Sequence, residues 1–249
     1  MSPTNYKNTR PVRDRELSSA KDSTTKQREF SSNGIKIIGF DLDQTLYPKS
    51  PEIDEAIQQY IYEKISEKLN IDREMAKEKF DGLYQKGKGL SGSRTLMTFG
   101  FERDVAKNIV QEALENADAI LNFLVPDKKV ANFLEKMKNK YGSIDLITGS
   151  NKNSTRRKLE KLDIPIELFS YVITSDDGSK SDLSALRIWL DYYPNYKPEN
   201  FLYIGDRVSS DFEKPKELGI KSILVNIVEP DKTVDCLQLQ SLTDLKKYL

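Results

Sequence analysis

Histidine is absent from all 249 residues of this sequence. Without an imidazole, the chain cannot build a Ser-His-Asp or Cys-His catalytic group or a metal site with histidine ligands. Catalysis would therefore depend on carboxylates, lysines and hydroxyls, together with a hard cation of the kind that oxygen ligands hold.

Cysteine and long apolar runs are almost as scarce. Cys236 is the only cysteine, so no disulfide can form within the chain, which fits a reducing compartment and predicts a cytoplasmic protein. No apolar stretch is long enough to span a bilayer, and the N-terminus lacks the apolar region of a signal peptide. We therefore expect no membrane partner.

An excess of either charge is also missing, because 39 basic residues balance 39 acidic ones. Such a chain creates no global field toward nucleic acid, so we expect no nucleic-acid partner. Residues 1–33 are rich in Ser, Thr, Lys and Arg and poor in apolar side chains. A segment of this kind cannot bury enough surface to offset the entropy of ordering, which predicts a disordered N-terminal tail.

Beyond the tail, buried strands alternate with amphipathic helices. Strand-like apolar runs are expected at 35–40, 143–148, 171–174, 201–204 and 221–225. Helical patterns are expected at 128–140, 153–162, 180–192, 211–218 and 241–249. This alternation predicts an α/β fold with a doubly wound, Rossmann-like parallel sheet.

No strand pattern appears between residues 51 and 122. Apolar residues recur at helical spacing in three segments, 51–69, 73–84 and 105–121. A glycine-containing loop between Tyr84 and Met97 carries Lys86, Lys88 and Arg94 and is more simply a solvated loop than a substrate contact. We predict an all-α domain at 51–122, inserted into a core formed by 34–50 and 123–249.

Polar residues gather where the predicted strands end. They are Asp41, Asp43, Thr148, Gly149, Ser150, Lys180, Asp206 and Asp211. In open parallel sheets, ligands bind beyond the carboxyl ends of the strands. Carboxylates collected there repel one another unless a divalent cation binds them, and Mg2+ is the usual one. A cation, a lysine and a hydroxyl suit a phosphate dianion, which a carboxylate can attack to form an aspartyl-phosphate.

These stretches resemble the four motifs of the haloacid dehalogenase (HAD) superfamily of phosphohydrolases. The matching residues, in motif order, are Asp41, Asp43 and Thr45; Thr148; Lys180; and Gly205, Asp206 and Asp211. The resemblance covers about residues 35–249, with the helical insertion in the place of the family's C1-type cap. The FDLDQTLY opening and the Tyr84–Met97 loop are similar to those of pyrimidine 5′-nucleotidase-like members.

The resemblance implies a role for each residue. Asp41 would attack phosphorus, and Asp43 would protonate the leaving oxygen and then deprotonate the hydrolytic water. Thr148 would bind a phosphoryl oxygen near the amides of Gly149 and Ser150. Asp41, Asp206 and the main-chain carbonyl of Asp43 would bind Mg2+. Lys180 would neutralise charge on the nucleophile and on the transferring group. Asp211 would lie beside the metal or hold Lys180. Ser181 departs from the family pattern, which often has proline after the lysine.

We therefore predict a Mg2+-dependent phosphatase of a small phosphorylated metabolite, with a nucleoside monophosphate as one candidate. Asp43 argues against a true dehalogenase, which lacks the second aspartate. A phosphomutase remains the alternative enzyme, and a binding or scaffold protein that retains the fold without turnover is the alternative outside catalysis. A response-regulator receiver also phosphorylates an aspartate, but it is shorter and has no helical insertion.

Overall fold

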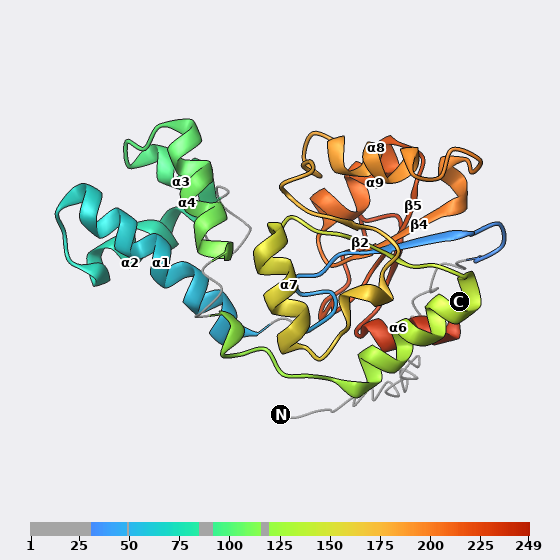
Figure 1. Ribbon diagram of the computed structural model, residues 1–249. Helices are drawn as coiled ribbons and strands as arrows, with labels where there is room; N and C mark the ends of the chain where they lie inside the picture. The colour runs from blue at the N-terminus through green and yellow to red at the C-terminus, as the bar shows by residue number, and fades with distance from the viewer. Residues whose placement is uncertain (1–30, 49, 85–91, 116–119) are drawn as a thin grey trace, which may run out of the picture.

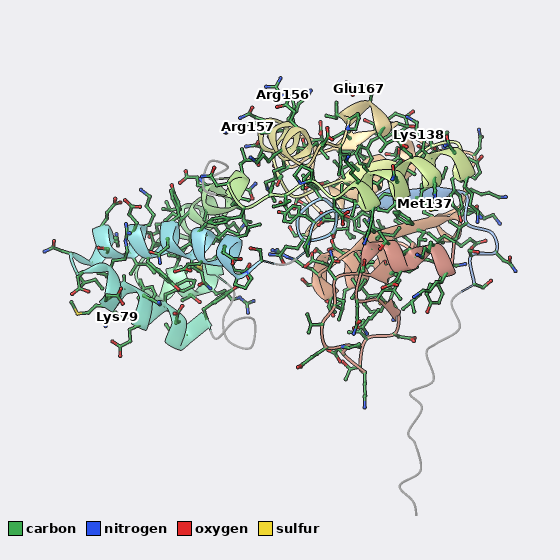
Figure 2. The ribbon with its side chains drawn as sticks, turned by 90° about the horizontal axis from the view of Figure 1, so that it is seen from below. Lys79, Met137, Lys138, Arg156, Arg157 and Glu167 are labelled. Carbon is green, nitrogen blue, oxygen red and sulfur yellow. The ribbon has the colours of Figure 1, made fainter. Side chains whose placement is uncertain are left out.

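The computed structural model describes residues 31–48, 50–84, 92–115 and 120–249. Most of the predicted tail, residues 1–33, lies outside these ranges. The described elements form a parallel sheet with helices on both faces, and a group of helices to one side of it (Figures 1 and 2). Within these ranges, no helix has both the length and the apolar character needed to cross a membrane.

Six parallel strands form one sheet in the order β3-β2-β1-β4-β5-β6. They are β1 (Ile37–Phe40), β2 (Asp145–Ile147), β3 (Val172–Ile173), β4 (Phe201–Gly205), β5 (Lys221–Leu224) and β6 (Leu237–Gln238). The register pairs Phe40 of β1 with Leu146 of β2 and Ile204 of β4, so these three strands end at about the same level. The predicted parallel sheet is confirmed, and β6 is a further edge strand that the sequence pattern missed.

Helices cover both faces of the sheet, as a doubly wound fold requires. The long ones beside it are α6 (Lys128–Tyr141), α7 (Lys152–Lys161) and α8 (Ser184–Asp191). Phe133 of α6 packs with Phe40 and Ile38 in one hydrophobic cluster. Ile37 points to the opposite face and packs with Trp189 of α8 in a second cluster. The alternation of neighbouring β1 residues between the two clusters explains why the whole strand is apolar.

Gly39 lets the tryptophan approach β1 closely. A Cβ added to Gly39 would lie 2.6 Å from atoms of both Ile147 and Trp189, so no larger residue fits there. The Trp189 indole Nε1 donates a hydrogen bond to Asp145 Oδ2 at 2.8 Å, which satisfies its one donor inside the core.

Three predicted helices differ from the structure. The segment predicted at 180–192 becomes helical only at Ser184, because Leu183 adopts a left-handed conformation (φ 72°). The segment at 211–218 consists of a π-helix (Val208–Glu213) and the short α9 (Lys214–Glu217). The closing segment is a 3-10 helix (Leu242–Lys247).

Between β1 and α6 the described chain contains helices and no strand. Its elements are α1 (Pro51–Leu69), α2 (Arg73–Tyr84), α3 (Gly92–Thr98) and α4 (Arg103–Glu115). Ser50 caps α1 by accepting a hydrogen bond from Ile53 N, and Pro51 occupies the first turn. These helices share a hydrophobic cluster of their own, and Ile57 packs against both this cluster and the one beneath α6.

The predicted loop between Tyr84 and Met97 is helical in its described second half. Helix α3 takes up its second half and includes Arg94. Lys86 and Lys88 lie outside the described residues.

Candidate active site

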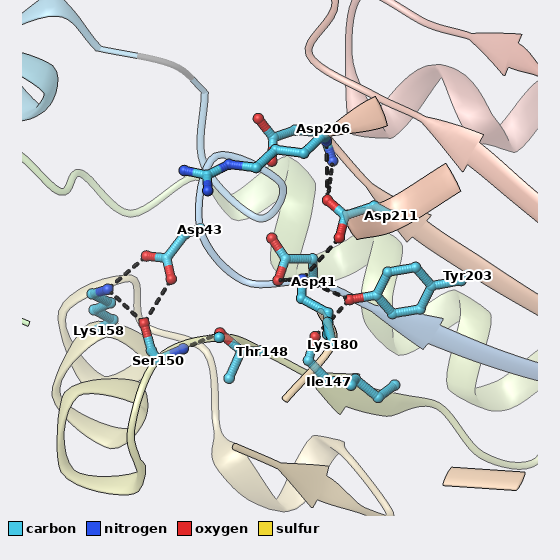
Figure 3. Close-up of polar contacts among 12 residues, drawn as sticks. Asp41, Asp43, Ile147, Thr148, Ser150, Lys158, Lys180, Tyr203, Asp206 and Asp211 are labelled. Carbon is cyan, nitrogen blue, oxygen red and sulfur yellow. Dashed lines mark hydrogen bonds and ion pairs between the residues drawn. The ribbon is translucent and has the colours of Figure 1, made fainter. Parts of the chain in front are cut away.

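The nucleophile candidate, Asp41, directly follows β1 and is 5% exposed. Its amide continues the strand pairing by donating to Ile204 O at 2.8 Å. Lys180 Nζ donates to Asp41 Oδ1 and to Asp211 Oδ1, both at 2.8 Å (Figure 3). Three motif residues that are distant in sequence therefore meet in one buried group.

A group of carboxylates surrounds this lysine. One oxygen from each of Asp41, Asp206 and Asp211 lies within 4.8 Å of the others, and all three residues are buried. Burial raises the pKa of Asp41 to about 7, with Lys180 opposing the rise and the neighbouring carboxylates adding to it. A cluster of three buried carboxylates with an oxygen donor set fits a hard divalent cation such as Mg2+.

Both carboxylate oxygens of Asp211 accept hydrogen bonds from the protein. Burial acts to raise the pKa of its carboxyl, but the charge of the Lys180 ammonium and the hydrogen bonds from Lys180 and the Arg207 amide together lower it. Its second oxygen accepts hydrogen bonds from the amides of Asp206 and Arg207, at 3.1 and 3.0 Å. Both Asp211 oxygens are therefore engaged by the protein, which fits a residue that holds the lysine and the following loop.

The side chain of Asp43 lies outside this carboxylate group. Its Oδ1 accepts hydrogen bonds from Lys158 Nζ at 2.6 Å and from Tyr47 OH at 2.7 Å. Its Oδ2 accepts one from Ser150 Oγ at 2.7 Å. Burial would raise the pKa of Asp43, but Lys158 and the two hydroxyls overcome it and lower the pKa to about 2. Asp43 is therefore a carboxylate in this state of the site.

The loop after β2 brings Thr148, Gly149 and Ser150 to the same edge. The Thr148 hydroxyl accepts a hydrogen bond from Ser150 N at 3.1 Å, and both residues are buried. Gln111 of α4 reaches this loop from the helical insertion and donates to Gly149 O at 3.1 Å. The insertion and the loop therefore touch beside the carboxylates.

Three polar residues at this site escaped the sequence analysis. Lys158 comes from α7. Tyr203 of β4 accepts from Lys180 Nζ at 3.1 Å and donates to Ile147 O at 2.6 Å. Asn226, after β5, donates to the main-chain carbonyls of Gln44, Thr45 and Tyr47 at 2.8, 3.2 and 3.3 Å. Together their hydrogen bonds connect β1, β2, β4 and β5, or the loops that follow these strands.

Comparison with known proteins gives a consistent picture. Residues 37–225 match the family described as haloacid dehalogenase-like hydrolase. A glyceraldehyde 3-phosphate phosphatase from Methanocaldococcus jannaschii is 28% identical over 227 residues, which are 86% of this chain and 98% of that protein.

Solved structures share the fold. A HAD phosphatase from Thermococcus onnurineus superimposes with a TM-score of 0.59 at 21% identity, covering 86% of this chain and 97% of that one. A protein described as a β-phosphoglucomutase from Thermotoga maritima gives 0.53 at 18% identity, covering 86% and 100%. At these identities the likeness extends to the fold alone.

Proposed function

This chain belongs to the haloacid dehalogenase-like hydrolase family and is a phosphoric monoester hydrolase, and we propose that it is a Mg2+-dependent phosphatase that forms an aspartyl-phosphate on Asp41. The observation that carries the proposal is the buried group in which Lys180 joins Asp41 to Asp211 while Asp206 lies within 4.8 Å. A carboxylate that is held by an ammonium and faces a cation site is suited to attack a phosphate dianion.

In the first step, an oxygen of Asp41 attacks phosphorus and the bond to the leaving oxygen breaks. Lys180 neutralises charge on the attacking carboxylate. Thr148 and the Gly149 amide bind phosphoryl oxygens, and the Ser150 amide orients the Thr148 hydroxyl. Asp206, Asp41 and the carbonyl of Asp43 would hold Mg2+, which when bound supplies positive charge to the phosphoryl group.

Asp43 transfers the protons. As a carboxylate it has the form that removes a proton from water while the water oxygen attacks phosphorus and the bond to Asp41 breaks. To protonate the leaving oxygen first, Asp43 must itself gain a proton, and a phosphate dianion beside it raises its pKa and favours that gain.

We further propose the domain division expected from the sequence, with a core at 34–50 and 123–249, a C1-type cap at 51–122 and an N-terminal tail at 1–33. The cap is supported by the separate hydrophobic cluster of α1–α4 and by the contact of Gln111 with Gly149. Closure of such a cap would exclude water from the phosphoenzyme and select the leaving group.

The substrate is proposed to be a small phosphorylated metabolite in the cytoplasm. The lone Cys236 supports that compartment. The relative named for glyceraldehyde 3-phosphate favours a short sugar phosphate, whereas the resemblance to pyrimidine nucleotidases favours a nucleoside monophosphate. A screen with triose phosphates and nucleoside monophosphates separates the two.

The proposal is tested by p-nitrophenyl phosphate hydrolysis in Mg2+ and in EDTA. We expect turnover only with Mg2+, a hydroxylamine-sensitive phosphoenzyme in quenched wild-type samples, and neither turnover nor phosphoenzyme for Asp41→Asn. Asp191→Asn, at an exposed position on α8, is the matched control. Near-normal hydrolysis by Asp41→Asn would refute the nucleophile assignment.

Two other outcomes select the alternatives. Isomerisation that depends on a bisphosphate, with slow hydrolysis, identifies a phosphomutase, and the neighbour described as a β-phosphoglucomutase shares this fold. Mg2+ binding without turnover of any ester identifies a non-catalytic binding protein.

A further inference from the structure

Lys158 is a buried lysine that the proposed reaction leaves without a role. It is 1% exposed, and its ammonium lies 2.6 Å from Asp43 Oδ1 and 2.9 Å from Ser150 Oγ. Because Ser150 Oγ also donates to Asp43 Oδ2 at 2.7 Å, the three side chains form a closed triangle (Figure 3).

The fold directs Lys158 inward. On α7 and at its C-cap, the buried positions Thr155, Lys158, Leu159 and Leu162 recur at helical spacing. Arg156 of the same helix points away from the core (Figure 2) and forms a long surface ion pair with Glu160 at 3.8 Å. A lysine on the buried stripe loses hydration that its contacts must replace, so its position is set by those contacts rather than by solvent.

The triangle joins two loops that carry different parts of the chemistry. Asp43 follows β1, whereas Ser150 follows β2 in the loop that also contains Thr148. Ser150 N donates to the Thr148 hydroxyl at 3.1 Å, so the ammonium is linked to the phosphate-binding loop as well as to the carboxylate. Lys158 therefore fixes the separation between the proton-transfer group and the phosphoryl site.

We propose that Lys158 is a positioning residue that, with Ser150, holds the Asp43 carboxyl where it exchanges protons with the leaving oxygen and then with water. This inference depends on the proposed phosphatase function. Lys158 forms and breaks no covalent bond: the proton passes from Asp43 to the leaving oxygen as the phosphorus–oxygen ester bond breaks, and from water to Asp43 as phosphate is released.

The leaving group supplies a readout that a purely structural role would not change. An alkoxide must be protonated to leave, whereas p-nitrophenolate leaves without a proton. Since a positioned acid contributes roughly 10²–10⁴ in rate, Lys158→Met should lower kcat/KM for an alkyl phosphate such as glycerol 3-phosphate about 100-fold or more. For p-nitrophenyl phosphate, kcat/KM should fall by no more than about tenfold, because this leaving group depends little on the acid that Lys158 positions.

Two further variants sharpen the test. Lys158→Arg keeps the charge and should recover part of the loss with glycerol 3-phosphate. Arg156→Met makes a comparable change on the exposed side of α7 and should leave both esters unaffected. If Lys158→Met does not fold, Ser150→Ala removes the other arm of the triangle with a smaller change and must show the same dependence on the leaving group.

The results separate this inference from the proposed function. A loss of equal size for both esters, or no loss for either, overturns the role of Lys158 while leaving an active wild type and an inactive Asp41→Asn in place. A wild type that hydrolyses neither ester refutes the phosphatase and this inference together.

Discussion

Replacing Asp41 with asparagine should stabilise the metal-free protein although it removes the nucleophile. Burial raises the pKa of Asp41 from 3.8 to about 7, so ionising this side chain at neutral pH opposes folding. About three pKa units at ~1.4 kcal/mol each give a cost of about 4 kcal/mol well above pH 7. Asparagine removes that cost but also gives up the charge that Lys180 contacts, so we expect a net gain of about 1–3 kcal/mol.

The pH dependence has a defined sign. Between pH 3.8 and about 7 the folded protein keeps a proton on Asp41 that the unfolded chain has released. The folded state binds more protons in this window, so its stability falls as the pH rises and levels off above about 7. The advantage of Asp41→Asn should therefore be small at pH 4 and fully developed at pH 8.

Differential scanning calorimetry in EDTA at both pH values measures the effect. For a chain of this length, 1 kcal/mol corresponds to a change of about 2–4 °C in Tm. Added Mg2+ should raise the Tm of the wild type at pH 8 much more than that of Asp41→Asn. Asp191→Asn controls for loss of one surface charge. A variant that is no more stable than the wild type at pH 8, or equally favoured at both pH values, refutes the reasoning.

Three other substitutions test how the site is held. Lys180→Met leaves the buried carboxylates of its two partners without their ammonium and should lower the free energy of unfolding in EDTA by about 3–5 kcal/mol; an unchanged urea midpoint would contradict this. At Gly205, a Cβ would overlap the Asp211 carboxylate, so Gly205→Ala should lower kcat and should lower the free energy of unfolding by about 1–3 kcal/mol. Its control, Gly82→Ala, adds a Cβ in open space on α2 and should raise the free energy of unfolding by about 0.5–1 kcal/mol in the same urea titrations. Asn226→Ala removes the donor shared by the carbonyls after β1 and should cost about 1–3 kcal/mol and lower kcat; full activity would show that these hydrogen bonds do not order the loop.

The gathering of Asp41, Lys180 and Asp211 could be predicted because a parallel sheet brings the ends of its strands to one edge. The apolar runs showed where each strand ends, and the parallel topology then placed the polar residues after those ends close together. Helices α1 and α2 were predicted with their correct bounds because apolar residues recur in them at helical spacing.

The remainder depends on tertiary contacts that leave a weak local signal. In the sequence, Lys158 is one basic residue among several on a polar helix, and only its place on the stripe with Leu159 and Leu162 hints at burial. Strand β6 has two residues, too few for a period to appear. The late start of α8 depends on the left-handed Leu183, a conformation that sequence rarely predicts for leucine.

Trp189, buried beneath β1 with its indole bonded to Asp145, is the only tryptophan in the chain. Its emission should be shifted to the blue in the native protein and should report on the sheet alone, because the cluster of α1–α4 contains no indole. Far-ultraviolet circular dichroism, in contrast, follows those helices as well. If the two hydrophobic clusters melt independently, the optical transitions will separate, and intrinsic fluorescence will report the loss of the sheet without any label.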